Sequence, residues 1–547
     1  MKRLSPHYLF FLLVTISCSA QIEAPETLIK ENNIKAHIKT LASDDFLGRK
    51  PGTKGEQKTI QYIKSQLVAS DVLPANNGSY FQEFKIQKVK FSESSPMVIH
   101  SKNNKRTYAF EKDFYAKTSY KLNQTVEVKA AEMVFIGFGI VAPEYNWNDY
   151  KDIDVKGKIV VVLFSDPGYH SKDPELFNGE QPTYYAGIRH KKREAAKHGA
   201  AGLIMIHDDA INWDAVKDES EAPIFIEGQP QLASDGLKFS GLISKALMND
   251  LITDSDYKID YVKSALAKDF SALPLQSKLS ISLSATYEDL VSTNNVVGIV
   301  KGAKRPDEYV LYTAHWDHVG TRAPNMGKDS IFNGAIDNAS GTAMQLEVAK
   351  AFSKMKKRPE RSVIFLFTSA EEMGLLGAEY YAHNPLYPLN KTACVINADA
   401  SFAVEKMRMV INVIESHTEM DVLVNKAASK LGREIVKTEG EELPGNVFQR
   451  SDHYPFVKKG VPAVWNVGNF EPLNGDKKEE EKIAAYMQHY HQVTDEYYEG
   501  FNAANITFDA QLNLLTGIEI ANSTEWPNWN EGSAYKSIRD KSINDSN

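Results

Sequence analysis

Cysteine is scarce in this chain of 547 residues, which contains only Cys18 and Cys394. Cys18 falls within an N-terminal segment that has the features of a cleaved leader, so Cys394 would be the only cysteine of the mature chain. An intrachain disulfide is therefore excluded, although an exported protein would be in a compartment that permits one. Cys394 stands in the apolar stretch "ACVINA", and we expect it to be a small buried residue.

A membrane-spanning run and an excess of positive charge are also missing. The N-terminal apolar run "YLFFLLVTI" is far shorter than the ~20 residues that a transmembrane helix needs. The formal net charge is −8 at pH 7, which gives no basic face for nucleic acid and no polybasic membrane anchor. The sequence therefore predicts no transmembrane span and no nucleic-acid partner.

The N-terminus has the features of a secretory signal peptide. The basic "MKR" precedes the apolar run, and the small residues "SCSA" follow it, which is the order typical of such leaders. We expect a signal peptide of residues 1–20, so that Gln21 becomes the first residue. Cys18 is an alternative site for a lipid anchor, although Thr15 is a poor residue three positions before it. The protein is thus expected to be exported: periplasmic, secreted, or lipid-anchored on the outer side of a membrane.

The rest of the chain divides into blocks that differ in their pattern of apolar and polar residues. A chain of this length is expected to hold two or three domains. Residues 29–86 have a helical pattern interrupted by the Gly- and Pro-containing "DDFLGRKPGTKG", which predicts a loop. Residues 125–286 contain two apolar strands around one helix, a small βαβ-like unit. From Asn294 onward, near-continuous apolar strands alternate with helices. This alternation predicts an α/β fold with a mostly parallel, twisted sheet and helices on both faces.

Acids and histidines gather where the strands of the last block end. Ligands of open α/β sheets bind beyond the carboxyl ends of the strands, and buried carboxylates are costly unless they are paired. Mixed carboxylate and imidazole groups suit Zn²⁺ or a similar divalent ion, so we predict a metal centre here. By chemistry alone, His453 and His491 are equally good as its last ligand. The gathered residues are His315, Asp317, Asp337, Glu371, Glu372, Asp399, His453, His489 and His491.

Six motifs, in their order along the chain, resemble the zinc aminopeptidase family M28, which has a two-metal site. They are "AHWDHVG", "GAIDNASGTA", "TSAEEMGLLG", "NADA", "SDHYPF" and "YHQVTDE". The segment "LASDDFLGRKPGTKGE" resembles the family's N-terminal segment, and the middle block resembles a protease-associated (PA) domain. The resemblance implies a zinc-exopeptidase-like peptidase domain in two pieces, residues 24–124 and 287–525. It also implies an inserted α/β or β-rich PA domain at residues 125–286 and a C-terminal tail at residues 526–547.

The resemblance also implies the ligands of two Zn²⁺ or similar divalent cations per chain. Asp337 would bridge both ions. His315 and Asp399 would complete one site, and Glu372 and His491 the other, with His491 chosen over His453 because of its place in "YHQVTDE". The "SDH" residues would then support the site from outside it, and His489 would lie away from it. Family members carry a cis peptide after the bridging aspartate, so the Asp337–Asn338 bond is expected to be cis.

Three further residues receive roles from the same resemblance. Glu371 would be the general base, Asp317 would orient His315 as metal-bound imidazoles require, and Tyr490 would donate to the tetrahedral oxyanion. The expected activity is that of an exported exopeptidase, an aminopeptidase that removes N-terminal residues from peptides through a metal-bridged water. The alternatives are a carboxypeptidase-type peptide hydrolase on the same scaffold, a glutaminyl cyclase, or a non-catalytic binding protein. The last two are disfavoured because every ligand and the base are retained.

Overall fold

The computed structural model describes residues 24–544, apart from residues 103, 111, 119–124, 174, 178, 180–182, 208–223, 228–235, 323–328, 438–443 and 534. The predicted signal peptide of residues 1–20, with Cys18, lies outside the described residues. Cys394 is buried and unpaired, as expected. Within the described ranges, no helix combines the length and the apolar character that crossing a bilayer requires.

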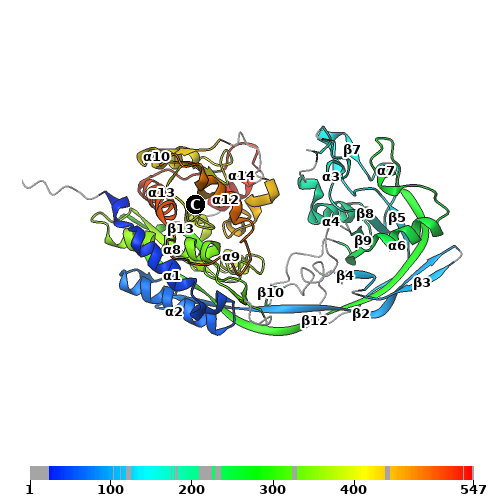
Figure 1. The fold of residues 1–547 in the computed structure, drawn as a ribbon, viewed down its shortest axis with the longest axis horizontal. Coiled ribbons are helices and arrows are strands. Elements are labelled where there is room, and N and C mark those ends of the chain that lie inside the picture. Colours follow the sequence, from blue (N-terminus) through cyan, green and yellow to red (C-terminus); the bar gives the residue numbers. More distant parts are fainter. Residues whose placement is uncertain are drawn as a thin grey trace, which may run out of the picture.

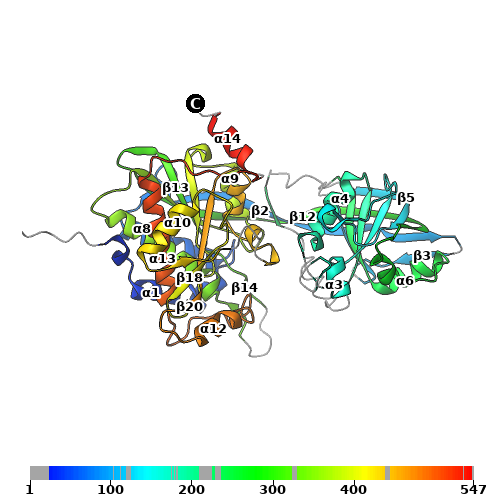
Figure 2. The ribbon, with the colours of Figure 1, turned by 90° about the horizontal axis from the view of Figure 1, so that it is seen from above.

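Two bodies are joined by a long antiparallel ribbon of two strands (Figure 1). Strand β2 (Phe81–Ser101) runs out of the first body, and β12 (Leu273–Val300) returns to it. The two strands pair along most of their length, from Phe81 opposite Val296 to Ser101 opposite Ser277. The view from above shows the same two bodies, with the strands of the ribbon running from one to the other (Figure 2).

The sheet of the first body has a parallel centre. Strands β20, β17, β13 and β16 lie side by side and run in the same direction. On one side of this centre, β12 pairs antiparallel with β16 and β1 pairs with β12. On the other side, β18 pairs antiparallel with β20, and β19 pairs with β18. The bounds are β1 Leu73–Pro74, β13 Arg305–His315, β14 Gly320–Thr321, β15 Ile331–Phe332, β16 Arg361–Thr368, β17 Thr392–Asn397, β18 Met407–Asn412, β19 Glu434–Ile435 and β20 Ala463–Pro472.

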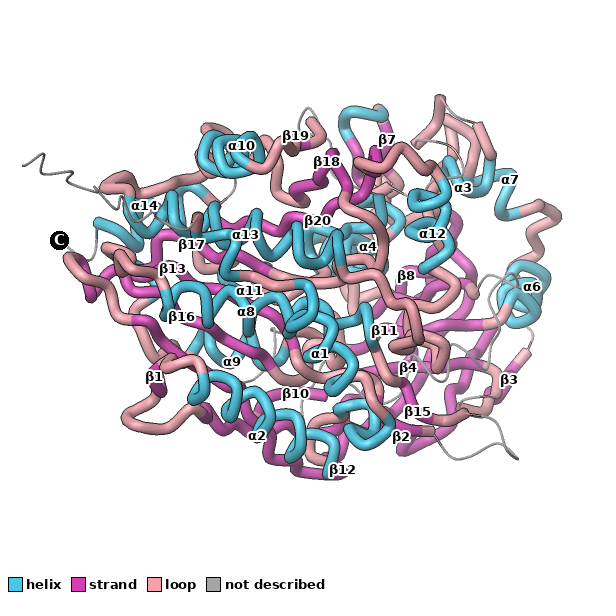
Figure 3. Tube along the Cα trace, turned by 60° about the vertical axis from the view of Figure 1, so that its left-hand side comes forward, coloured by secondary structure: helices cyan, strands magenta, loops and turns pink. Residues whose placement is uncertain are grey.

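Helices cover both faces of this sheet, as predicted. Alternate residues of β16 show the two faces: Phe365 belongs to one buried cluster, and its neighbours Ile364 and Leu366 belong to another. Helices α1, α2, α8 and α13 contribute to the first cluster, and α9 and α11 to the second; Figure 3 shows α8 and α13 lying across the strands. The bounds are α1 Glu31–Leu41, α2 Lys54–Ala69, α8 Gly341–Lys354, α9 Leu376–His383, α10 Asp421–Lys430, α11 Tyr454–Val457, α12 Lys478–Tyr486, α13 Ala504–Asn522 and α14 Lys536–Asn544.

The second body contains the predicted βαβ-like unit. Strands β8 and β9 are parallel neighbours, with helix α4 between them in the sequence. Strand β10 pairs with β2 near the first body instead. The bounds are β3 Lys105–Tyr108, β4 Phe114–Thr118, β5 Thr125–Phe135, β6 Val141–Ala142, β7 Trp147–Asn148, β8 Ile159–Leu163, β9 Gly202–Ile206, β10 Ile224–Ile226, β11 Phe239–Ile243, α3 Pro167–Ser171, α4 Ile188–Lys197, α6 Lys245–Asp254 and α7 Tyr261–Ala265.

Three of the predicted domain assignments need correction. Strands β3 and β4 fall within the expected first piece of the peptidase domain, residues 24–124, but Tyr108 and Phe114 are buried in the core of the second body. The ribbon strand β12 also runs without interruption through the expected boundary at residue 287. The segment 526–547 is not a free tail in its described part, because Trp529 and Arg539 are fully buried. The description of the second body as a PA domain stays a prediction.

Candidate metal centre

Three parallel strands end at the same edge of the first sheet and carry acids and a histidine there. His315 is the last residue of β13 and lies opposite Thr368, the last residue of β16. Glu371 and Glu372 follow β16 after two residues. Asp399 follows the end of β17 after one residue. Strand β17 is the parallel neighbour of β13 on its other side. The strand register thus brings these side chains together beyond the carboxyl ends of the strands.

Asp337 lies at the centre of the cluster and faces two histidines. Its Oδ1 is 3.3 Å from His315 Nε2, and its Oδ2 is 3.2 Å from His491 Nε2. Asp337 belongs to a short π-helical turn, 335–340, that leads into α8. The Asp337–Asn338 peptide bond is cis, so this expectation from the sequence is confirmed.

The two histidines each meet a second carboxylate. His315 Nε2 lies 3.4 Å from Asp399 Oδ1, and His491 Nε2 lies 2.8 Å from Glu372 Oε2. The five predicted ligands therefore form two histidine–carboxylate pairs that share Asp337, one pair at each of its oxygens. Such donor atoms are those that Zn²⁺ takes in proteins.

One polar atom of this cluster is not satisfied by its neighbours. His491 Nε2 is buried and, despite its short distance to Glu372, has no hydrogen-bond partner. Although burial opposes it, the carboxylates of Asp337 and Glu372 raise the pKa of His491 to about 10. Glu371 and Asp399 likewise outweigh burial and raise the pKa of His315. Metal ligation needs neutral imidazoles and charged carboxylates, so a divalent cation would displace these protons and balance the negative charge. The residues therefore fit a divalent metal.

Glu371 lies in the cluster, next to the two histidine–carboxylate pairs. It forms a group with His315 and Asp399 whose ligand atoms all lie within 4.8 Å of one another. Burial, and then the neighbouring carboxylates of Asp399 and Glu372, raise the pKa of Glu371. The preceding residue, Ala370, has a φ of 56°, a left-handed conformation that non-glycine residues rarely adopt and that is concentrated at functional sites.

The carboxylate of Asp317 contacts the glutamate pair more closely than it contacts His315. It accepts hydrogen bonds from the backbone N–H of Glu371 at 3.1 Å and of Glu372 at 3.4 Å. His315 Nδ1 is 3.2 Å from the Asp317 backbone carbonyl and 3.8 Å from its carboxylate. The Asp317 backbone carbonyl is thus nearer to the imidazole than the carboxylate is, and the carboxylate also fixes the turn that carries Glu371. The orientation of His315 by the Asp317 carboxylate stays a prediction.

The residues around "SDHYPF" lie behind the cluster, as expected. His453 is fully buried, its Nε2 is 2.8 Å from the Phe448 carbonyl oxygen, and burial lowers its pKa to about 4. Ser451 Oγ donates to Asp399 Oδ2 at 2.5 Å. His489 is turned toward the Thr494 hydroxyl at 2.8 Å, in an exposed position. Neither histidine is directed at Asp337.

Tyr490 packs directly on the predicted ligand His491. The two rings are stacked with their centroids 3.9 Å apart. Burial, and then the charges of Asp337 and Glu372, raise the pKa of Tyr490, so its hydroxyl stays protonated at neutral pH and can donate a hydrogen bond. Its contact with an oxyanion stays a prediction.

Reasoning from the sequence missed two residues that contact the cluster. His318 is almost fully buried, and its Nδ1 lies 2.5 Å from Glu372 Oε1, whereas His491 faces the other oxygen, Oε2. Asp495 accepts hydrogen bonds from the backbone N–H groups of Ile336 and Asp337. Both residues stand inside motifs that had been singled out, "AHWDHVG" and "YHQVTDE". For His318, the sequence signal was the presence of a second histidine in "AHWDHVG".

We expect His318→Ala to weaken metal binding about 10- to 100-fold, because partners that orient a ligand have effects of this size. Loss of the Nδ1 contact frees Glu372 to rotate away from His491. Metal affinity measured by competition with a chelator checks the prediction, and His489→Ala, at an exposed histidine of the same neighbourhood, is the control and should bind metal normally. An affinity equal to that of the control would mean that His318 does not orient Glu372.

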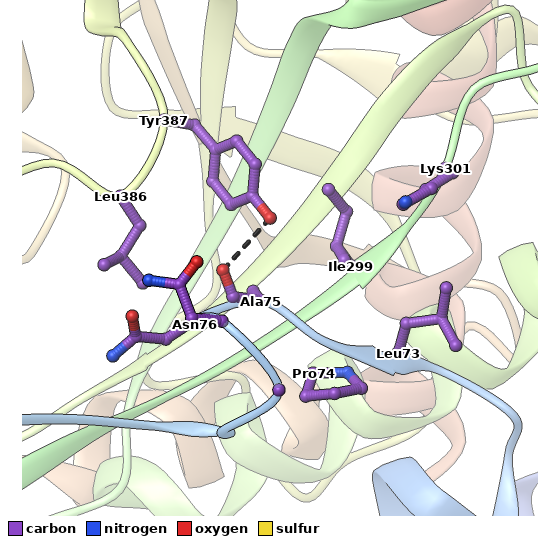
Figure 4. A pocket seen from close by; sticks show the side chains of 10 residues that line it. Leu73, Pro74, Ala75, Asn76, Ile299, Lys301, Leu386 and Tyr387 are labelled. Atoms are coloured by element: carbon purple, nitrogen blue, oxygen red, sulfur yellow. Dashed lines mark hydrogen bonds between the residues drawn. The ribbon is translucent and has the colours of Figure 1, made fainter.

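A hollow of about 400 Å³ lies elsewhere in the first body (Figure 4). It is lined by strand β1, by Ile299 of β12 and by Tyr387, whose hydroxyl donates to the Ala75 carbonyl oxygen at 3.0 Å. None of the predicted metal ligands lines it. The hollow therefore has no part in the centre described above.

Comparison with known proteins gives a family match for one part of the chain. Residues 295–510 match the model of "Peptidase family M28", and this range holds all five predicted ligands. These residues form an M28 peptidase domain. The M28 match begins within β12 and so excludes the second body.

Individual relatives agree with this assignment over parts of the chain. The mouse protein "Aminopeptidase NAALADL1" is 36% identical over 135 residues, which are 24% of this chain and 16% of the mouse protein. A "Probable zinc metalloprotease" of Leptosphaeria maculans is 37% identical over 202 residues, 32% of this chain and 46% of the fungal protein. Proteins described as glutamate carboxypeptidases also match. The chain thus matches less than half of the length of these relatives.

The fold outside the M28 domain has a counterpart among solved structures. The aminopeptidase from Aneurinibacillus sp. strain AM-1 superposes with a TM-score of 0.51 and covers 92% of this chain and 96% of its own, at 18% sequence identity. At this identity the likeness establishes the fold alone. It supports the α/β fold class predicted for the M28 domain together with an additional body.

Proposed function

We propose that this protein is an exported metal-dependent exopeptidase, an aminopeptidase that releases N-terminal residues from peptides with two Zn²⁺ or similar cations. The observation that carries the proposal is the position of Asp337. Each of its carboxylate oxygens faces a different histidine, and each histidine faces a further carboxylate, Asp399 or Glu372. This is the arrangement that a pair of cations sharing one carboxylate requires.

The five ligands would hold the cations, and the neighbouring residues would act on the substrate. When bound, the cations supply Lewis acidity, which polarises the scissile carbonyl and lowers the pKa of the attacking water. Glu371 accepts a proton from that water at a carboxylate oxygen and passes it to the nitrogen of the leaving amine. The Asp317 carboxylate holds the Glu371 backbone during this transfer. The Tyr490 hydroxyl donates a hydrogen bond to the oxyanion that forms at the former carbonyl oxygen.

The choice between the two ends of the peptide rests on family likeness. The mouse relative is described as an aminopeptidase, whereas other matching proteins are described as glutamate carboxypeptidases. The preference for an aminopeptidase follows the resemblance of the six motifs. A carboxypeptidase on the same scaffold is the second candidate, favoured by those carboxypeptidase relatives.

The N-terminal segment and the second body would also have roles in this function. Residues 1–20 would act as a signal peptide, with Cys18 as an alternative lipid attachment site. The second body would be a PA domain inserted into the peptidase domain through the ribbon of β2 and β12. Peptides would be the partners of the site, and neither nucleic acid nor a membrane span takes part.

A paired substrate series tests the proposed function. We expect the purified protein to contain two divalent ions per chain, measured by elemental analysis, and to cleave aminoacyl-nitroanilides and free peptides. N-terminal acetylation should abolish cleavage, whereas C-terminal amidation should leave it intact, because an aminopeptidase must recognise the free amine. Removal of metal with a chelator should abolish activity, and zinc should restore it. The opposite dependence on the two blocking groups would establish a carboxypeptidase.

A further inference from the structure

The Arg49 side chain is buried behind the metal centre, although it comes from the N-terminal loop of the first body. Arg49 ends the short 3₁₀ segment Asp44–Arg49, which lies between α1 and α2, and its side chain is 1% exposed. A fully buried guanidinium is uncommon and needs partners for its five N–H donors. Its partners identify what it does.

The guanidinium donates four hydrogen bonds, all to backbone carbonyl oxygens. Two distant segments supply three of these acceptors, and helix α1 supplies the fourth. The bonds run from Nε to Trp316 at 2.9 Å, from Nη1 to Leu41 at 2.9 Å and to Asn333 at 2.5 Å, and from Nη2 to Gly334 at 2.9 Å. One rigid, planar group therefore ties together three parts of the chain that are remote in sequence.

The two distant segments carry His315 and Asp337, two of the ligands predicted for the ion that His315, Asp337 and Asp399 would hold. Trp316 directly follows His315, and Gly334 stands three residues before Asp337. The hydrogen bonds of the Arg49 guanidinium thus fix the separation between the end of β13 and the turn that presents Asp337. It does so from the side of the backbone, without contacting either ligand side chain. Burial lowers the pKa of Arg49 to about 10, and the nearby carboxylates of Asp495, Asp337, Asp317 and Glu372 oppose this shift, so the guanidinium stays charged at neutral pH.

The backbone that delivers Arg49 is itself unusual. Leu47, Gly48 and Arg49 have φ values of 51°, 62° and 51°, so three successive residues are left-handed, two of them not glycine. A Cβ on Gly48 would lie 2.3 Å from the Gly320 carbonyl oxygen and 2.6 Å from that of Phe332. Such conformations persist where the surroundings determine them, typically at functional sites. The turn brings the chain close to the same two segments that the guanidinium binds.

We propose that Arg49 is a positioning residue of the metal centre. It holds the His315 and Asp337 segments at the spacing at which both side chains face one cation. This inference rests on the proposed function, since it assumes that the cluster binds metal. Arg49 touches no reacting atom and acts only through the peptide groups next to the ligands.

Arg49→Lys tests this role, because lysine keeps the charge and much of the length but cannot form the planar fork. We expect metal affinity to fall about 10- to 100-fold, as for other residues that orient ligands. The catalytic defect should appear as a lower kcat, with KM nearly unchanged. Arg361→Lys is the matched control. Arg361 is equally buried and donates to the Ile520 and Glu525 carbonyl oxygens, but it lies at the opposite end of β16. The control should keep wild-type metal affinity even if its thermal stability falls.

Chemical rescue separates positioning from general stability. Methylguanidinium added to Arg49→Ala should restore metal affinity in a saturable way, whereas methylammonium should not. The inference is overturned if Arg49→Lys binds metal as tightly as Arg361→Lys, or if neither Arg49 variant folds while Arg361→Lys does. A wild-type protein that binds no metal would refute the proposed function itself, and a metal-binding wild type with unaffected Arg49 variants would refute only this inference.

Discussion

Replacing Glu371 by Gln is expected to lower kcat by about 10²-fold or more while both metal ions remain bound, the loss typical of a missing general base. The amide keeps the size of the side chain but cannot accept the proton. Glu371 is grouped with His315 and Asp399, yet the ion pair with His491 is made by Glu372. Single-turnover kinetics and elemental analysis of the same sample check the prediction.

The neighbouring glutamate provides the contrast for this experiment. Glu372→Gln changes the same chemical group one residue away, but it removes a ligand charge, so we expect that variant to lose metal. If Glu371→Gln loses metal as Glu372→Gln does, Glu371 is a ligand and the base must be sought elsewhere. If Glu371→Gln keeps normal kcat, general base catalysis by this residue is refuted.

The largest effect on metal content is expected from His491→Ala, which should lose one ion and nearly all activity. His491 Nε2 faces both Asp337 and Glu372, so its removal takes one of the three donors from that side of the bridge. His453→Ala should retain both ions with about a 10- to 100-fold loss of activity, because His453 is directed at the Phe448 carbonyl and lies behind the site.

These two variants are measured side by side for metal content, activity and thermal stability. The stability measurement matters because His453 is fully buried, so its truncation leaves a cavity, whereas His491 is partly exposed. The reverse pattern, with metal lost in His453→Ala and kept in His491→Ala, would reassign the last ligand to "SDHYPF".

The centre of the fold could be predicted from the sequence because its strands are buried on both faces. The stretches "EYVLYTA", "SVIFLFT" and "ACVINA" became β13, β16 and β17, since continuous apolar runs have few alternatives to a covered parallel sheet. The ribbon could not be predicted in the same way. Residues 87–101 are rich in serine and have no long apolar run, and their extended conformation depends on pairing with β12, far away in the sequence.

The residues of the candidate site also fall into those that the sequence indicates and those that only their contacts reveal. Residues that carry their chemistry in their own side chains, such as Asp337 and His315, could be picked out from type and position. His318 had a signal in the sequence, its place in "AHWDHVG", but not its contact with the Glu372 carboxylate. Arg49 could not be picked out, because its importance lies in its bonds to four peptide carbonyls. A backbone acceptor leaves no signature in the sequence, and only the folded chain reveals it.

The ribbon of β2 and β12 also sets an order of assembly during synthesis. The chain emerges N-terminus first, so α1, α2 and β2 are made before the whole second body, and their partners β12 and β13 come after it. Pairing at the far end of the ribbon, Ser101 with Ser277, closes the shorter loop and costs less chain entropy than pairing Phe81 with Val296. All strands of the second body are also made before β13 to β20, so we expect the second body to acquire its core first. Pairing of β2 with β12 would then proceed from the second body toward the first. Arg49 would contact Trp316, and the metal centre would form, only after most of the chain has been synthesised.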